Sequence, residues 1–394
     1  MEHTDVLVIG GGVIGVAFAA SLESAGLLVT VIDQGSNPKL NSLVAKRQKN
    51  SVLVDTNPRI SALSISAWDF LNSFGEGLSS APYQRMEVLD GEGTGRLTFC
   101  AKELGLGELG HIVENDQLSA ELINNLKRES NVRFHWNTEL KELEKLEDGY
   151  AIKLDSGILQ TKLLVGADGN QSKVRKLANI NSCKWTYNQK GIVAIVETEL
   201  PHVRTARQWF TSNGILAFLP LADKNLCSIV LSTKNYDEIM SMDEQALAYF
   251  LENLSERVLG KIVGVGPRLA FPILQEHSLR YVDENLAVIG DAAHTIHPLA
   301  GQGANIGFAD AKDLSQLIKQ SCLKGTSLGC REVLNQYQSS RRRDNLSTAA
   351  LMEIFARGFS SSHPTVQWLR NEGMNFVDRS GLFKKIIAKL ATLR

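Results

Sequence analysis

The chain has 394 residues and a formal net charge of −1, with 42 lysines and arginines against 43 aspartates and glutamates. This length allows a large core and two domains, and the even charge balance excludes nucleic acid as a partner. The five cysteines are scattered without a C-x-x-C pair, which excludes a disulfide framework and a cysteine-based zinc site. We expect a cytoplasmic protein, because Glu2 and Asp5 stand where a signal peptide would be basic and no apolar run reaches the roughly 20 residues that span a bilayer.

A dinucleotide-binding fingerprint opens the chain. It begins with an apolar strand over 6–9, which is followed by the glycines of G-x-G-x-x-G at Gly10, Gly12 and Gly15. A helical pattern over 16–25, a second apolar strand over 28–32 and the acid Asp33 complete it. This order predicts a tight turn, a helix amino end for a pyrophosphate and a carboxylate for ribose hydroxyls. A second G-x-G-x-x-G, beginning at Gly105, follows a charged segment and precedes no helix, so we interpret its glycines as turn residues. The chain therefore has one dinucleotide cradle.

Two further apolar strands are predicted to end in glycine turns. Residues 163–165 precede the turn that holds Asp168, and residues 286–289 precede Gly290 and Asp291. Carboxyl ends of buried strands that lie far apart in sequence commonly converge on one ligand.

The stretch 290–311 is rich in glycine and alanine and also carries two histidines, His294 and His297. Small residues allow a backbone to approach a ligand closely. After it, an apolar stripe predicts a helix that begins near residues 303–305, with members Ile306, Ala309, Leu314, Leu317 and Ile318. The amino end of such a helix stabilises an anion by about 0.3–2 kcal/mol.

Taken together, these marks resemble those of the single-component flavin-dependent aromatic hydroxylases. The run HPLAGQGANIGFAD (297–310) resembles the signature of the ubiquinone-biosynthesis branch of that family, and RISALS (59–64), HIVEND (111–116) and AFLPL (217–221) are similar to the same branch. The likeness covers nearly the whole chain. It implies an α/β fold: a Rossmann-like FAD-binding domain with a mainly parallel sheet, an inserted antiparallel-sheet substrate domain and C-terminal helices.

Residues 180–272 support this division, because their patterns are typical of antiparallel strands. We expect a discontinuous FAD-binding domain over residues 1–72, 98–178 and 273–340. The substrate domain is expected over 73–97 and 179–272, and a C-terminal helical segment over 341–394. Four aromatic residues are candidates for lining an apolar substrate cavity, although core packing is the commoner role for any one of them: Trp209, Phe210, Phe218 and Phe271.

The resemblance also implies roles for individual residues toward FAD. The first three glycines bind its pyrophosphate, Asp33 its adenosine ribose and Asp291 its ribityl or pyrophosphate part, while Asp168 braces the site and helps the reductant to dock. Arg59 and Asn115 contact the flavin, although arginine or glutamine is more usual than asparagine at the second position. The full set of expected cofactor-binding residues is Gly10, Gly12, Gly15, Asp33, Arg59, Asn115, Asp168, Gly290, Asp291, Pro298, Gly301, Gly303, Ala304 and Asn305.

The implied reaction has two halves. NAD(P)H reduces FAD by hydride transfer, and O2 then adds to flavin carbon 4a, giving a hydroperoxide that hydroxylates the ring of a polyprenylated phenol or quinol. The expected partners are this substrate, O2 and other proteins of ubiquinone biosynthesis. A general base would assist, and His294 and His297 are candidates. Because a histidine in a structural turn is more common, the catalytic residues are left unassigned.

The end of the chain supports two hypotheses. In 381–394 an apolar helical face, formed by Phe383, Ile386, Ile387, Leu390 and Leu393, lies opposite Lys384, Lys385 and Lys389. This segment either contacts the inner membrane peripherally or packs on its own domain or a partner, and packing is favoured. Upstream, SRRRDN (340–345) is interpreted as a solvated helix face, and 37–58 as a mobile surface loop.

Other functions remain open on the same scaffold. A flavin-dependent halogenase would show a W-x-W-x-I-P stretch, which the sequence lacks. A flavin prenyl reductase would consume no oxygen. A non-catalytic FAD-binding subunit of a biosynthetic complex would keep the glycine motifs without turnover.

Overall fold

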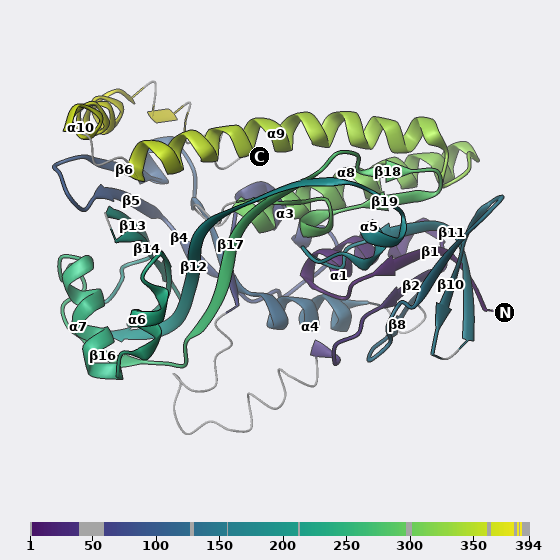
Figure 1. The fold of residues 1–394 in the computed structure, drawn as a ribbon, viewed down its shortest axis with the longest axis horizontal. Helices are drawn as coiled ribbons and strands as arrows, with labels where there is room; N and C mark the ends of the chain where they lie inside the picture. The colour runs from purple at the N-terminus through teal and green to yellow at the C-terminus, as the bar shows by residue number, and fades with distance from the viewer. Residues whose placement is uncertain are drawn as a thin grey trace.

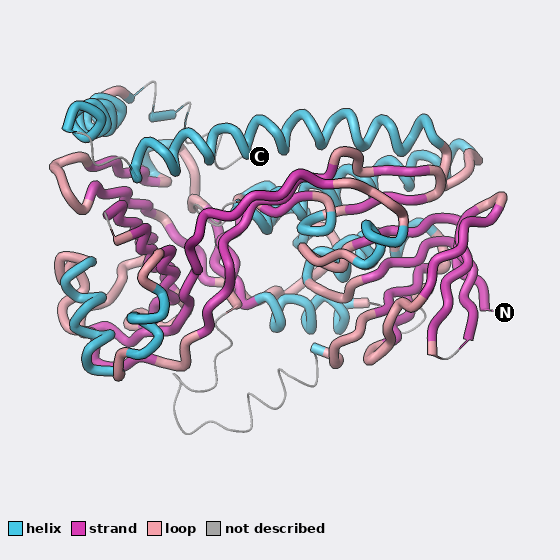
Figure 2. The backbone as a smooth tube through the Cα atoms, in the orientation of Figure 1, coloured by secondary structure: helices cyan, strands magenta, loops and turns pink. Residues whose placement is uncertain are grey.

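The computed structural model describes residues 2–38, 59–126, 130–155, 157–211, 213–296, 302–360 and 364–381, together with 384, 385 and 387. Two halves are joined by a long curved ribbon of two strands, and one long helix lies along both halves (Figures 1 and 2). Most of the loop predicted over 37–58 falls outside the described residues.

A mainly parallel sheet forms the core of the first half. Its strands are β1 Glu2–Ile9, β2 Val29–Ile32, β8 Val132–His135, β9 Glu142–Leu146, β10 Gly149–Leu154, β11 Gly157–Gly166, β18 Val282–Asp283 and β19 Leu286–Val288. They run in the order β18-β19-β11-β1-β2-β8, and β10 and β9 extend antiparallel from β11. Because β19, β11, β1 and β2 pair in parallel, their carboxyl ends meet at one edge, and the four predicted buried strands are confirmed.

Five of the described helices belong to this half of the molecule and pack around the parallel sheet. They are α1 Val13–Ser21, α3 Ile65–Asn72, α4 Asn115–Asn125, α5 Lys173–Leu177 and α8 Gln302–Lys324. Helix α1 contacts α4 and α8, and its residues from Gly15 to Ser21 are all buried, which explains why the sequence there is small and apolar around the whole helix. Helix α8 begins at Gln302, one residue from the predicted start.

A second, largely antiparallel sheet forms the other half, as the pattern over 180–272 predicts. Its strands are β5 Arg85–Asp90, β6 Arg96–Cys100, β12 Ser182–Thr198, β13 Thr205–Thr211, β14 Gly214–Pro220, β15 Leu226–Thr233, β16 Ile262–Val265, β17 Leu269–Ser278 and β20 His294–Thr295. Among the described strands of this sheet, β13 and β5 alone pair in parallel. β12 and β17 form the long ribbon that reaches toward the parallel sheet (Figure 1). One face packs on α6 Tyr236–Ser241 and α7 Glu244–Leu254, where Leu231, Leu247 and Leu251 are buried.

A small third sheet lies between the two halves. It consists of β3 Ile60–Leu63, β7 Gly110–Glu114 and β4 Ala81–Tyr83, with β7 in the centre. Because Gly110 begins a strand here, the second glycine cluster forms turns and no dinucleotide cradle.

Two C-terminal helices complete the fold. Helix α9 Arg331–Ser360 runs along both halves and continues through residue 340, so the domain boundary expected there lies inside one helix. Helix α10 Pro364–Arg379 packs on β6, and its Arg370 Nη2 binds Asp90 Oδ1 at 2.8 Å.

Candidate active site

A large cavity opens where the parallel strands β1, β2, β8, β11 and β19 end. Its volume is about 1230 Å³, larger than the roughly 300–1000 Å³ of most small-molecule sites. It is bounded by the carboxyl ends of β1, β2, β11 and β19, by the amino ends of α1, α4 and α8, and by β17 of the second sheet. Crevices beyond the carboxyl ends of parallel strands are the usual ligand sites of such sheets.

The three glycines around the turn after β1 have two different roles: two are required by backbone packing, and one faces the cavity. Gly10 has φ +111°, and a Cβ there would collide with the carbonyl oxygen of Ala167. A Cβ on Gly15 would collide with the carbonyl oxygen of Gly10, so this glycine permits close packing of helix and strand. Gly12 differs, because a Cβ there would point into open space at the cavity. It precedes α1 without a capping side chain, which leaves the helix amino end available to an anion.

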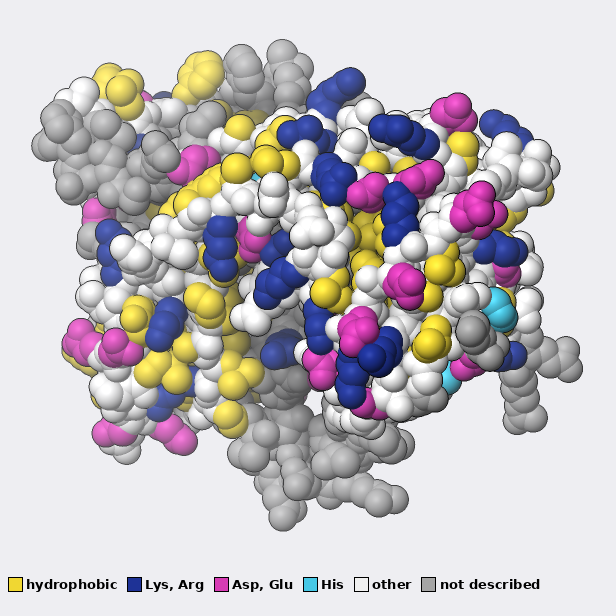
Figure 3. Space-filling model, turned by 45° about the vertical axis from the view of Figure 1, so that its right-hand side comes forward, with side chains coloured by type: hydrophobic (Ala, Val, Ile, Leu, Met, Phe, Trp, Pro, Cys, Tyr) yellow, Lys and Arg dark blue, Asp and Glu magenta, His cyan; other side chains and the backbone are white. Residues whose placement is uncertain are grey.

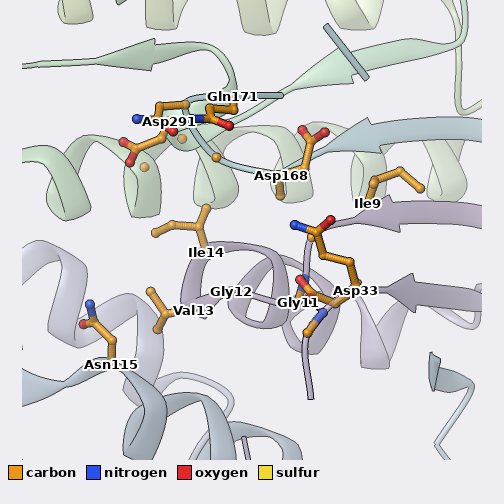
Figure 4. A pocket seen from close by; sticks show the side chains of 18 of the residues that line it. Ile9, Gly11, Gly12, Val13, Ile14, Asp33, Asn115, Asp168, Gln171 and Asp291 are labelled. Atoms are coloured by element: carbon orange, nitrogen blue, oxygen red, sulfur yellow. Dashed lines mark hydrogen bonds between the residues drawn. The ribbon is translucent and has the colours of Figure 1, made fainter. Parts of the chain in front are cut away.

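Asp33 stands at the end of β2 and binds the same turn. Its Oδ2 accepts a hydrogen bond from the Gly11 amide at 2.6 Å, and its Oδ1 accepts one from the Gly35 amide at 2.6 Å. These bonds fix a half-buried carboxylate at the cavity wall, where Figure 4 places it beside Gly11. A carboxylate in this position accepts hydrogen bonds from ribose hydroxyls.

Asp168 follows β11 and braces the next turn. Its carboxylate accepts hydrogen bonds from Ser172 Oγ at 2.5 Å and from the amides of Lys173 and Val174 at 2.6 and 3.0 Å. These three donors hold the amino end of α5. Asp168 therefore fixes a turn at the cavity wall, and its expected role toward FAD and the reductant stays a prediction.

Gly290 and Asp291 follow β19 in a short 3₁₀ turn, Gly290–Ala292. Gly290 has φ +58°, a conformation that favours glycine. The Asp291 side chain is exposed to the cavity, across from Asn115 in Figure 4.

The opposite wall is formed by Arg59, before β3, and by Asn115, the first residue of α4. The two backbones are joined, because the Asn115 amide donates to the Arg59 carbonyl oxygen at 3.0 Å. Asn115 Oδ1 is buried, and no donor within the described ranges lies within hydrogen-bonding distance of it. An unsatisfied buried acceptor is costly, and the residue that carries it lies at the wall of the cavity.

The start of α8 contributes its backbone to the site, and one expected residue has a different role. Gly303 and Ala304 line the cavity. Asn305 does not line it: its Oδ1 accepts from the Ser64 amide at 2.8 Å and its Nδ2 donates to the Ala62 carbonyl at 2.9 Å. It therefore ties α8 to β3. Three expected residues, His297, Pro298 and Gly301, lie outside the described residues.

Most of the aromatic residues expected at a substrate cavity belong to the core. Trp209 and Phe218 are buried in an edge-to-face pair with ring centroids 5.5 Å apart, in the cluster against α7. Phe210 is also buried. Phe271 of β17 lines the cavity, and residues 272–274 extend this apolar wall. A Cβ on Gly191 would lie 2.5 Å from the Phe271 ring, so this glycine allows the ring to lie on β12.

Two sequence interpretations of charged residues need correction or completion. Arg341, in the segment interpreted as a solvated face, has a side chain only 8% exposed and binds Asp310 Oδ1 at 2.8 Å. His294 is buried, and its Nε2 lies 2.5 Å from Asp310 Oδ2. This histidine is therefore bound to the Asp310 carboxylate, and it is not among the described residues that line the cavity. The sequence signal for Asp310 is an acid among the small and apolar residues of IGFADA, which indicates a buried partner.

Comparison with known proteins now identifies the family. A family model described as FAD binding domain matches residues 99–350, more than half of the chain, and one described as pyridine nucleotide-disulphide oxidoreductase matches residues 5–61. The chain is 33% identical to the 3-demethoxyubiquinol 3-hydroxylase of Escherichia coli (strain K12), over 99% of this chain and 98% of that protein. The chain belongs to the ubiquinone-biosynthesis branch of the FAD-dependent hydroxylases.

Other relatives and folds agree. The ubiquinone hydroxylase UbiL of Rhodospirillum rubrum is 31% identical over 98% of this chain and 89% of its own length. The crystal structure of p-nitrophenol 4-monooxygenase PnpA from Pseudomonas putida DLL-E4 superposes with a TM-score of 0.80 over 100% of both chains. PqsL from Pseudomonas aeruginosa gives 0.77 over 95% of this chain and 100% of its own. At 18% and 21% identity these two structures show a shared fold.

The cavity fits FAD on its own features. Its volume and the open cradle at Gly12, at the amino end of α1, suit a large ligand that carries a pyrophosphate. The protein is an FAD-dependent monooxygenase.

Proposed function

We propose that this hydroxylase transfers one oxygen atom of O2 to the ring of a polyprenylated phenol or quinol, with NAD(P)H as the reductant. One observation carries the proposal: the same cavity joins the nucleotide cradle of the parallel sheet to the apolar wall of β17 in the second sheet. A relative 33% identical to this chain is named for hydroxylation of a demethoxyubiquinol.

In this proposal the residues of the chain bind and orient FAD and shield the reacting ring from water. The amino end of α1 at Gly12 would hold the FAD pyrophosphate, Asp33 a ribose, and Asn115 and Asp291 opposite edges of the ligand. FAD bound there accepts hydride and activates O2. The β17 wall excludes water from the ring. In this proposal the parallel sheet with its helices is the FAD-binding domain, and the antiparallel sheet covers the substrate.

The experiment supplies purified, FAD-loaded protein with NAD(P)H and a prenylated phenol. We expect substrate-stimulated oxidation of NAD(P)H with matching oxygen uptake and a hydroxylated product by mass spectrometry. A reductase would leave oxygen unconsumed, a halogenase would need halide, and a non-catalytic subunit would bind FAD without turnover. In cells that lack the gene, the precursor that accumulates identifies the ring position. FAD binding with no substrate-dependent oxygen uptake for any prenylated phenol or quinol would contradict the proposal.

We also propose that the protein contacts a membrane surface through its C-terminal region. None of the helices in the described ranges is both long and apolar enough to cross a bilayer. The outer side of α10 exposes Trp368, Leu369 and Phe376 at 62%, 58% and 61%. The part of 381–394 that the structure describes supports packing as well, because Lys384 Nζ lies 3.1 Å from Asp378 and 3.5 Å from Glu103. Contacts with other proteins of ubiquinone biosynthesis remain part of this proposal.

A further inference from the structure

One buried carboxylate joins three elements behind the cavity. Asp310, in α8, is 0% exposed. It accepts hydrogen bonds from four groups: the Gly290 amide at 3.0 Å, His294 Nε2 at 2.5 Å, Arg341 Nε at 2.8 Å and Asn345 Nδ2 at 3.3 Å. These donors come from the 3₁₀ turn, from β20 and from α9.

The cluster is charged as well as buried. Burial opposes ionisation of Asp310, but His294 and Arg341 outweigh it and hold the pKa of this carboxyl at about 2. Arg341 also donates to Asn345 Oδ1 at 2.9 Å, so the guanidinium is fixed in turn. A buried ion pair of this kind adds little to stability compared with apolar packing. We therefore look for the role of this cluster in the positioning of the residues that it binds.

Asp310 lies directly behind the FAD-facing surface. Its Oδ2 holds the amide of Gly290, and the next residue, Asp291, is exposed to the cavity. One turn earlier in α8, Gly307 lines the same cavity, as do Gly303 and Ala304. From the other side, Arg175 Nη1 donates to the Ala292 carbonyl at 2.9 Å, so the 3₁₀ turn is held at both ends.

We propose that Asp310 is a positioning residue for FAD: it fixes the 3₁₀ turn and the amino end of α8 in one arrangement, so that Asp291 and the α8 backbone contact the flavin half of the cofactor together. The proposal rests on FAD binding in this cavity and is independent of the substrate. The adenosine half, held at Gly12 and Asp33, does not depend on Asp310.

The experiment compares two conservative variants. Asp310→Asn keeps the size of the side chain, but its amide nitrogen cannot accept the hydrogen bonds that Oδ2 or Oδ1 accepts. Tyr337→Phe is the matched control, because Tyr337 is also fully buried and also joins α9 to β19, through a 2.9 Å bond from its hydroxyl to the Val288 carbonyl. That bond ends two residues before Gly290 and leaves the Gly290 amide untouched.

The readouts are the dissociation constants for FAD and for ADP and the melting temperature of the apoprotein. For Asp310→Asn we expect the FAD dissociation constant to rise about tenfold or more while that for ADP stays within about twofold. The spectrum of the bound flavin should also shift. Tyr337→Phe should leave both dissociation constants within about twofold of the wild-type values, even if its melting temperature falls as much as that of Asp310→Asn.

Two results would overturn the proposal. One is an Asp310→Asn protein that binds FAD with wild-type affinity; the other is an equal loss of FAD and ADP binding, which indicates general destabilisation. If Asp310→Asn does not fold, Arg341→Lys keeps one cation but weakens the fixed pair, and a rise of about two- to fivefold in the FAD constant alone is expected. No change with this variant would equally contradict the proposal. Because these readouts require no turnover, they are independent of the proposed reaction.

Discussion

At the scale of single residues, Asn115 combines two opposed effects. Its buried Oδ1 is unsatisfied within the described part of the chain, which costs the apoprotein free energy. The side chain that carries it belongs to a residue at the wall of the cavity that we assign to FAD. If Asn115 lowers the stability of the apoprotein but contributes to FAD binding, a substitution should have opposite effects on these two properties.

We therefore predict opposite results for Asn115→Leu in the two states. The free energy of unfolding of the apoprotein should stay level or rise by about 1 kcal/mol, because an unpaired buried acceptor is removed. The FAD dissociation constant should rise about three- to tenfold, because a polar side chain at the cavity wall is replaced by an apolar one. Denaturant titration of the apoprotein and fluorescence titration with FAD measure the two quantities. Asn115→Gln keeps an amide and serves as the control; equal FAD affinity in the leucine variant would remove Asn115 from the site.

Sequence patterns located the residues at which a motif coincides with a strand end. Gly12, Asp33 and Asp291 all lie at the cavity for that reason. They did not locate the pair of Asp310 and Arg341, which are 31 residues apart in two helices. Whether an arginine in a charged run is solvated depends on which helix packs against it, and local sequence does not encode that packing. Nor did they indicate that the Asn305 side chain binds Ala62, in β3, and Ser64, the residue that follows it.

At the scale of elements, the turn from β1 to α1 makes different demands on its glycines. Gly10 needs a positive φ and the absence of a Cβ, whereas Gly12 has φ −67° and ψ 172°, which alanine also adopts. The first is required by the fold and the second by the ligand.

Alanine substitutions should separate these demands. Gly10→Ala should lower the free energy of unfolding by about 3 kcal/mol or more, or prevent folding, because the backbone of Ala167 cannot move away. Gly12→Ala should cost the apoprotein about 1 kcal/mol or less. Its FAD affinity should nevertheless fall about a hundredfold, because the methyl group occupies the approach of the pyrophosphate. Circular dichroism under denaturant and FAD titration report both. A Gly12→Ala protein that binds FAD normally would show that the cradle lies elsewhere.

Element types were predicted more completely than their pairing. The strands before Gly10 and Gly290 follow from short apolar runs that end in glycine. The parallel pairing of Thr205 with Arg85 and the third sheet, with Ile60 opposite Glu114, join segments far apart in the chain. Their register is set by the packing of the whole fold, and no local periodicity encodes it.

At the scale of the whole molecule, charges of both signs are mixed, but basic residues gather at the C-terminal end of the sequence, next to a helix that exposes apolar side chains. Lysine, arginine, aspartate and glutamate side chains are interspersed over the face seen in Figure 3, consistent with the net charge of −1. Residues 379–394 depart from this balance, with five basic and no acidic residues: Arg379, Lys384, Lys385, Lys389 and Arg394. They begin at Arg379, the last residue of α10. The inner side of α10 is fixed to β5 through Arg370 and Asp90, and its outer side exposes Trp368.

An apolar face beside a basic segment is suited to an anionic bilayer surface. We predict that the full chain co-floats with phosphatidylglycerol vesicles and much less with phosphatidylcholine vesicles. Deletion of 381–394, or Trp368→Ser, should each reduce the bound fraction several-fold, to roughly a third or less, by removing charge or buried apolar area. Leu323→Ser is the matched control, because Leu323 is 89% exposed and belongs to α8, outside the proposed membrane-contacting surface. Equal flotation of all four proteins would exclude this surface and leave packing within the chain as the role of the C-terminal segment.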